Sequence, residues 1–487
     1  MPSYRSEERP TAAGILAVAH ALCTIVFLSW RFGGMEAHAR ILAAYLGAVA
    51  PLMTILAWLQ APFSLRTRFL RIALPLAAIA VLVLVSATNV NLRASSVPGE
   101  PMTAVDAAGP MRLLPSTANP RLTLSDFFLK AGLVLIGLNI LLANPGRMLQ
   151  RLLLAGIAVN AAVLACIGSM LKLQGVTRIF DAYRSPNENF FSSFVYYNHW
   201  GGFALLGVAA AAGLALYSYR RHHRGTRQDS PALFFGVLTL FILISLPMSG
   251  ARASTAAGLI LAVVLAPRLA PHRVSRWHYF RISALSVVIV FGIAVAFGFL
   301  FAKGPVKFMF EKSATQLAAQ RTGGIGDSRF QVYRDTVRLF AQKPVFGWGW
   351  RSFQFAFPQV QSVRSKMQTE QRLPSVFVDA HNDWLQWLAE LGLVGFGLAI
   401  ASLVAIVRIA PPGYWLHSPS FELAAGLACL GLLAMVDFPI VCPAIVVTAA
   451  TLLATAAGYA WRRENEALSS ESRISPEDDS PLVEPRS

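Results

Sequence analysis

The sequence predicts an all-α fold: a polytopic membrane bundle of about twelve transmembrane helices with one large extracytoplasmic loop. Of the 487 residues, 55% are hydrophobic and only 14% are charged, and the mean hydropathy is +0.53. Apolar stretches of roughly 17 to 25 residues, long enough for a helix to cross a hydrocarbon core, recur along the chain. Because lipid offers no partners to backbone N–H and C=O groups, such stretches cross a membrane as helices.

The apolar stretches give the predicted spans in chain order. Their cores are residues 12–30, 41–59, 70–87, 127–142, 152–171, 200–217, 232–248, 255–266, 282–301, 384–407, 423–435 and 442–461. The fourth contains Lys130 and the eighth is short, so these two are the least typical of membrane spans.

Arginines mark alternate connecting loops, and positive residues in short loops stay in the cytoplasm. The basic set comprises Arg66, Arg68, Arg71, Arg147, Arg151, Arg220, Arg221, Arg224, Arg227, Arg268, Arg273, Arg276, Arg281, Arg462 and Arg463. We therefore expect both termini in the cytoplasm. The formal net charge of +17 is largely this topological signal, so the expected partner is a lipid bilayer and no nucleic acid.

The same alternation divides the chain into four parts. Residues 1–301 form spans one to nine, 302–383 a large outer loop, 384–461 spans ten to twelve, and 462–487 a cytoplasmic tail whose composition predicts disorder. A loop of this length in a compact bundle is typical of a functional segment. It holds twelve Lys or Arg against six Asp or Glu, a net charge of +6 that favours an anionic ligand.

A helix is predicted inside the large loop, because Asp327-Ser328 offers an N-cap and Lys343-Pro344 a stop. Its apolar stripe consists of Phe330, Tyr333, Val337 and Phe340. Arg329 lies in the first turn, while Arg334 and Arg338 lie four residues apart on another face. These arginines either bind substrate or contact lipid headgroups from an interfacial helix.

The segment Val378-Asp379-Ala380-His381-Asn382-Asp383-Trp384 leads into the tenth span and places His381 at or just before a helix N-terminus. The positive end of a helix disfavours imidazolium and a neutral imidazole is a usable base, whereas Asp379 and Asp383 favour the charged form, so the sequence leaves the direction of the pKa shift of His381 open. Asn382 and Asp383 are supporting candidates. The alternative is that His381 only caps the helix. Glu390 is expected to lie in the outer layer of the membrane, paired inside the bundle or supporting the site.

Two further polar positions stand at predicted outer ends of spans. Arg252 follows the very short turn Ser249-Gly250-Ala251, where an arginine is costly unless it meets an anion or snorkels to the surface. Asn198 and His199 lie among aromatic residues before the sixth span. Such a mixture suits a sugar, although an aromatic belt has the same pattern.

Three of these elements, in this order, resemble the bacterial O-antigen ligase and O-antigen polymerase superfamily of integral membrane proteins. They are Ser249-Gly250-Ala251-Arg252, the segment from Arg329 through Pro344 to Gly347-Trp348-Gly349, and His381-Asn382-Asp383-Trp384-Leu385 followed by Glu390-Leu391-Gly392-Leu393-Val394-Gly395. The resemblance covers the second half of the chain, and Asn198-His199 is a further similar segment. The sequence departs from the pattern at Ala251, where many members have Ser, and at Tyr197, where many have another Asn nearby.

The resemblance implies a GT-C-like fold and a glycosyltransferase that uses an undecaprenyl-diphosphate-linked glycan as donor, without a metal ion or cofactor. Arg252 and Arg329 would hold the donor diphosphate, and His381 would assist the acceptor hydroxyl. The implied acceptor is lipid A core, a growing glycan or a protein. The implied location is the bacterial inner membrane, with the active site facing the periplasm.

The residues lead to a compatible chemistry by themselves. Nucleotide sugars and ATP are cytoplasmic, so an outward-facing transferase needs a lipid-linked donor, and guanidinium groups suit its diphosphate. Three functions stay open: a ligase, which we favour; a polymerase of repeat units; and a transporter with Arg252, Lys130 and Glu390 along its pathway.

Overall fold

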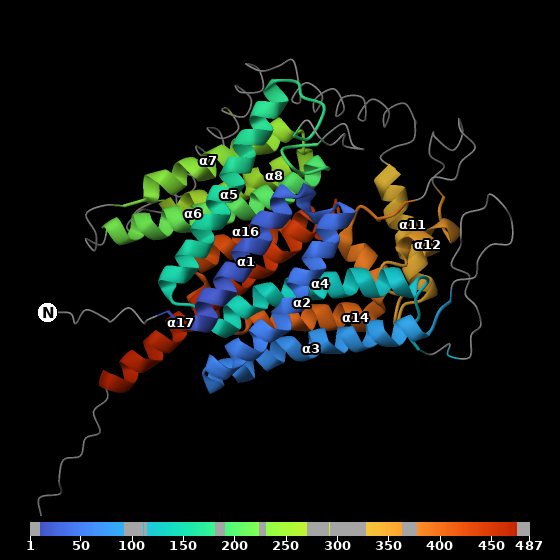
Figure 1. Cartoon of the computed structure of the whole chain (residues 1–487), viewed down its shortest axis with the longest axis horizontal. Helices are drawn as coiled ribbons and strands as arrows, with labels where there is room; N and C mark the ends of the chain where they lie inside the picture. The colour runs from blue at the N-terminus through green and yellow to red at the C-terminus, as the bar shows by residue number, and fades with distance from the viewer. Residues whose placement is uncertain are drawn as a thin grey trace, which may run out of the picture.

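The computed structural model describes residues 10–91, 111, 114–180, 190–223, 230–269, 292, 328–362 and 377–474. These residues are mostly helical and form no β-strand, only two isolated bridges. Within them, ten helices are long and apolar enough to cross a membrane, which confirms the predicted all-α polytopic bundle. Figure 1 shows most of these helices running side by side along the long axis of the molecule.

The ten helices match predicted spans in order. They are α1 (Ala12–Trp30), α2 (Ala37–Gln60), α3 (Phe63–Thr88), α4 (Pro120–Ala143), α5 (Arg147–Leu173), α6 (Tyr197–His223), α7 (Ala232–Ser249), α8 (Arg252–Leu265), α14 (Asp383–Val407) and α17 (Pro443–Ile474). The predicted eleventh span corresponds to the shorter helix α16 (Ser420–Leu433). The predicted ninth span, 282–301, lies outside the described residues except for Gly292.

Small residues let the helices approach closely. Helix α4 packs against α2 and α17, α6 against α7 and α16, and α14 against α3. Where α2 crosses α4, a Cβ added to Gly132 would come 2.7 Å from the Cα of Gly47. Such backbone contact is the usual means of helix association in lipid, where burial of apolar side chains gives little driving force.

Helix α17 extends beyond its predicted end. We expected a disordered tail from residue 462, whereas α17 continues to Ile474. Ion pairs to the basic loops hold this extension: Arg147 Nη2 lies 2.7 Å from Glu466 Oε2, and Arg68 pairs with Glu464. Disorder was predicted from the composition of the tail alone, and composition does not reveal these ion pairs because their arginines come from distant parts of the chain.

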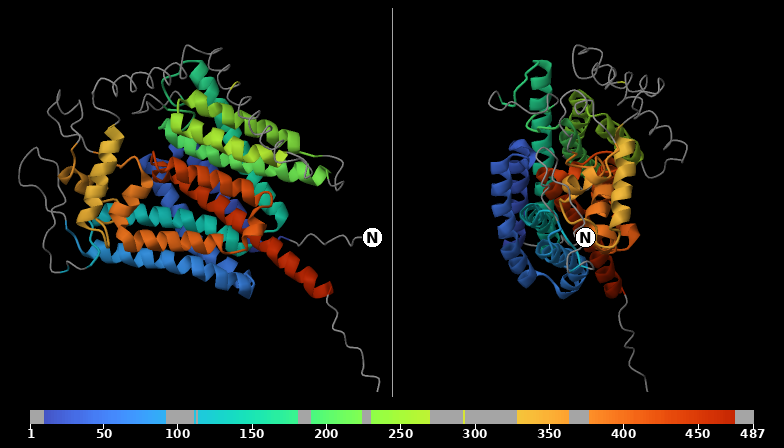
Figure 2. Two further views of the ribbon diagram at one scale, coloured as in Figure 1. Left: turned by 180° about the vertical axis from the view of Figure 1, so that it is seen from behind. Right: turned by 90° about the vertical axis from the view of Figure 1, so that its right-hand side faces the viewer.

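The helix predicted inside the large loop is confirmed as α11 (Ser328–Gln342). It stands across the end of the bundle next to α12 (Phe353–Ala356), as both views in Figure 2 show. Its buried face is formed by Val332, Asp335, Thr336 and Leu339, whereas Phe330 and Val337 of the predicted stripe are exposed. Buried Asp335 is satisfied because its Oδ2 accepts hydrogen bonds from the backbone N and Oγ of Ser362, at 2.8 and 2.6 Å.

A break in α14 joins the bundle to the large loop. Gly392 adopts φ +64° and ψ −172°, a conformation that only glycine adopts readily. The backbone groups freed by the break bond to the loop: Leu393 N donates to Pro344 O at 2.8 Å, and Gly349 N donates to Glu390 O at 2.8 Å. A Cβ on Gly347 would lie 2.5 Å from the carbonyl carbon of Glu390. The loop can therefore approach the broken helix this closely only with glycine at position 347.

Candidate active site

Three of the predicted site residues, Asn198, Arg329 and His381, meet around one turn at the end of the bundle where α6, α8 and α14 begin, which we call the site end. The turn, 436–438, follows α16. Arg329 Nη1 donates to Val436 O at 3.1 Å, and Asn198 Nδ2 donates to the carboxylate of Asp437. The ring of Phe438 lies 4.8 Å from that of His381. Residues from α6, α11, the start of α14 and this turn therefore form one cluster.

His381 is held in an unusual backbone conformation. Its φ of +54° is in the left-handed region, which is uncommon for a residue with a Cβ. Tyr333 Oη donates to His381 O at 2.9 Å, so α11 fixes the peptide that carries the imidazole. Strain of this kind concentrates at functional sites.

The capping function expected as an alternative for His381 belongs to its neighbour. Asn382 is the N-cap of α14, and its Oδ1 accepts from Leu385 N at 3.0 Å. Asp383 ties the same helix start to the segment after the turn, because its Oδ2 accepts from Ile440 N at 2.9 Å. Both side chains are buried, and their contacts orient His381.

Asn198 and His199 lie beneath the cluster, 6% and 3% exposed. Two rings flank the imidazole of His199: the ring centroid of Tyr196 lies 5.1 Å from that of His199, and the ring centroid of Phe438, in the turn, lies 5.5 Å from it. Asn198 Nδ2 also donates to Tyr196 Oη at 2.7 Å. These contacts make the pair a buried support of the site rather than an exposed aromatic belt.

Arg252 reaches the site end through a tight helix–helix turn. Gly250 closes α7 with φ +80°, and Arg252 is the first residue of α8. The start of α8 packs on α6, where a Cβ on Gly201 would come 2.1 Å from Ser254 Oγ. Arg252 therefore lies at the site end of the bundle, where Arg329 contacts the turn at 436–438.

The other two arginines of α11 have different surroundings. Arg334 is exposed, and Arg338 Nη1 pairs with Asp335 Oδ1 of the same helix at 3.2 Å, with a side chain 54% exposed. Neither of them hydrogen-bonds to the turn at 436–438. Arg329 alone among the three arginines of α11 contacts it.

Asp437 is an acidic group that the sequence analysis did not identify. It is 1% exposed, and burial raises the pKa of its carboxyl to about 6, a shift that the Arg329 guanidinium opposes. Near neutral pH the cluster therefore contains a buried carboxylate that complements Arg329. The signal in the sequence is an aspartate between two apolar stretches, where an ionisable residue usually has a function.

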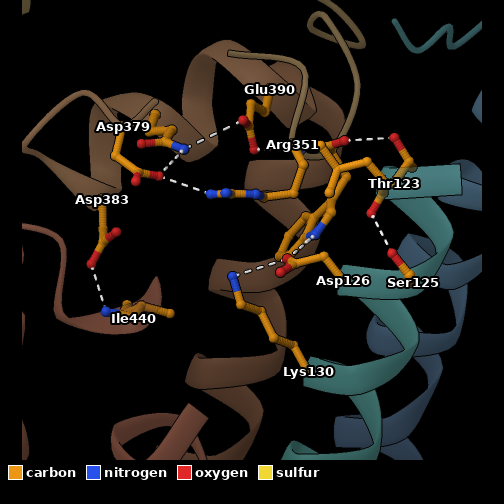
Figure 3. A network of polar contacts seen from close by, with 12 residues as sticks. Thr123, Ser125, Asp126, Lys130, Arg351, Asp379, Asp383, Glu390 and Ile440 are labelled. Atoms are coloured by element: carbon orange, nitrogen blue, oxygen red, sulfur yellow. Dashed lines mark hydrogen bonds and ion pairs between the residues drawn. The ribbon is translucent and has the colours of Figure 1, made fainter. Parts of the chain in front are cut away.

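A second polar network joins Arg351 to Asp379 and Glu390 (Figure 3), and the sequence analysis did not identify Arg351. Arg351 Nη1 donates to Asp379 Oδ1 at 2.8 Å, and Gln386 Nε2 donates to the same oxygen at 3.2 Å. Burial alone would lower the pKa of Arg351, but the Asp379 and Glu390 carboxylates raise it. Since Asp379 precedes His381 by two residues, this ion pair fixes the loop that leads to the imidazole.

Glu390 completes the same network from inside α14. It is 3% exposed, and its two oxygens accept from Arg351 N at 3.0 Å and Phe353 N at 3.1 Å. On α4, Lys130 Nζ lies 3.1 Å from Asp126 Oδ2. Glu390 and Lys130 thus both have partners inside the protein, and for Glu390 this is the paired arrangement expected from the sequence.

No metal centre is evident in the part of the chain described: there, no group of three His, Cys, Asp or Glu side chains is placed to hold an ion. The expectation of a metal-independent and cofactor-free reaction stays a prediction.

Comparison with known families gives one finding. Residues 235–400 match the family model described as O-antigen ligase. The matched region contains Arg252, Arg329, His381 and Glu390, while Asn198, His199 and the turn at 436–438 lie outside it. A search of curated proteins gave no match.

Proposed function

We propose that the chain is a membrane glycosyltransferase of the O-antigen ligase and polymerase type and, within that type, a ligase. The match of residues 235–400 to the family model described as O-antigen ligase and the ten helices that could cross a membrane support this proposal. In this proposal it transfers a glycan from undecaprenyl diphosphate to an acceptor hydroxyl, with lipid A core as the acceptor. The site end faces the periplasm of the inner membrane, and both termini are cytoplasmic.

The position of Arg252 and Arg329 at the same end of the bundle as His381 carries the proposal. Arg252 begins α8 beside the start of α6, and Arg329 donates to a turn whose Phe438 ring contacts His381, so the two guanidinium groups would form a site for an anionic group. A planar guanidinium binds phosphate oxygens in a bidentate manner, and a helix N-terminus such as that of α8 favours anions. The pair would bind the donor diphosphate and stabilise the charge that builds up on it as it departs.

His381 has the position of the general base. The acceptor oxygen attacks the anomeric carbon, its proton passes to the His381 imidazole, and the bond between the anomeric carbon and the diphosphate oxygen breaks. Diphosphate leaves without prior protonation, so an acid on the opposite side is not required. A single direct displacement inverts the configuration of the anomeric carbon.

Reconstitution with a lipid-diphosphate glycan and candidate acceptors tests the proposal by mass analysis of the product. Glycan on lipid A core supports the ligase. A lengthened lipid-linked glycan would identify a polymerase instead, and solute flux without turnover would identify a transporter.

The variants His381→Ala and Arg252→Lys sharpen this test. We expect the first to abolish transfer and the second to impair it, because a lysine offers a point charge where the arginine offers a planar fork. Arg334→Gln is the matched control, since Arg334 is exposed on the same helix as Arg329. Near-normal transfer by the His381 variant would remove this residue from the mechanism.

A further inference from the structure

A cavity lies at the far end of the bundle, opposite the site end. It has a volume of about 300 Å³ and opens between the start of α5, the end of α6 and the start of α7. This volume is at the lower limit of small-molecule sites, which measure about 300–1,000 Å³. Along α6, 23 residues separate Asn198 from Arg221, or about 35 Å, so the cavity is independent of the site already described.

The lining combines cationic and aromatic groups. The guanidinium carbons of Arg151 and Arg221 lie over the ring of Tyr217, at 5.9 and 5.8 Å from its centroid. Arg221 Nη1 donates to Tyr217 Oη at 3.2 Å, and Arg151 Nε donates to Arg147 O at 3.1 Å. Among the described residues that line the cavity, none is acidic.

The remaining wall is apolar and continues onto the outside of the bundle. Met148, Leu152 and Phe235 line the cavity. Two of them also reach the outer surface of the bundle, since Met148 is 65% exposed and Leu152 56% exposed. In a membrane protein, large exposed apolar side chains on a spanning helix face lipid. The cavity therefore has arginines on one side and, on the other, an apolar surface that acyl chains would cover.

We propose that this cavity binds the headgroup of an anionic phospholipid. Arg151 and Arg221 contact the phosphate, and the acyl chains lie outside along Met148 and Leu152. Basic pockets between membrane helices bind anionic headgroups in this way, whereas a free phosphate would make no use of the apolar wall. With the proposed orientation, the lipid belongs to the cytoplasmic leaflet, where the arginine-rich loops also lie.

Lipid binding to the full chain in phosphatidylcholine nanodiscs, with or without phosphatidylglycerol, tests the proposal by native mass spectrometry. We expect phosphatidylglycerol to be retained in preference to phosphatidylcholine. Each of Arg151→Gln and Arg221→Gln should weaken this retention about fivefold, and the double variant about 25-fold. Arg71→Gln is the matched control, because Arg71 is an exposed arginine near the start of α3 and does not line the cavity.

Two measurements keep the test decisive. Added salt should weaken the retention of phosphatidylglycerol by the unaltered protein, a result that needs no variant to fold. Glycerol 1-phosphate should compete poorly, because it has no acyl chains. Equal retention of both lipids, equal loss in the Arg151 and Arg71 variants, or effective competition by glycerol 1-phosphate would overturn the proposal, whatever the outcome of the glycan-transfer assays.

Discussion

The break in α14 offers a quantitative test of how the large loop is attached to the bundle. Gly392→Ala places a Cβ on a residue with φ +64°, at a point 2.3 Å from Val345 O. The backbone strain costs about 1–3 kcal/mol. The shift needed to relieve the clash also breaks the two bonds from Leu393 N and Val394 N to the loop, at about 1 kcal/mol each. The expected destabilisation is therefore about 3–5 kcal/mol.

Gly397→Ala is the matched control, since Gly397 lies in the same helix and nothing stands within 4 Å of an added Cβ. There, alanine should be neutral or stabilise the helix by up to about 1 kcal/mol. Denaturant-induced unfolding in detergent, followed by tryptophan fluorescence and residual transfer activity, measures both variants. Equal stability of the two variants would refute the claim that the break at Gly392 holds the loop.

Three further predictions concern the site. Arg329→Gln should lower the rate of glycan transfer about 10²- to 10³-fold, whereas Arg334→Gln should leave it near normal, and a rate assay with both variants checks this. Transfer should fall as the pH drops through about 6, because Asp437 takes up a proton and its attraction for Arg329 is lost, and Asp437→Asn should remove that part of the pH profile. Protonation of Asp437 does not itself destabilise the fold, since a carboxyl whose pKa is raised by burial favours the folded state more as the pH decreases. Arg351→Gln should cost about 3–5 kcal/mol of stability by removing the cation between half-buried Asp379 and buried Glu390. Arg338→Gln, which removes an exposed ion pair, should cost under about 1 kcal/mol in the same unfolding assay.

The spans and the site end could be predicted from the sequence because each depends on local patterns. Apolar length identifies α1 to α8, α14 and α17, and the cap and stop signals identify α11. Alternation of the spans then places Arg252 and His381 at the same end. The structure brings both of them to the site end, as the alternation predicted.

The features that sequence reasoning missed depend on contacts between distant segments. Asp437 was recognisable as a site residue only through its interactions with Asn198 and Arg329, and Arg351 only through its ion pair with Asp379. The residues of these pairs stand at no characteristic distance from one another in the sequence. The packed face of α11 was also not its most apolar stripe, because Asp335 is buried by its bonds to Ser362. Hydropathy patterns do not contain such long-range hydrogen bonds.

In the proposed function, Arg252 and His381 act at one site on the outer side of the membrane. Single cysteines introduced as Arg252→Cys and His381→Cys, after replacement of Cys23, Cys166, Cys429 and Cys442 by alanine, test it with a membrane-impermeant thiol reagent. We expect the reagent to label both positions from the periplasmic side, and the lipid-diphosphate donor to protect both. Labelling of the two positions from opposite sides of the membrane would contradict the account.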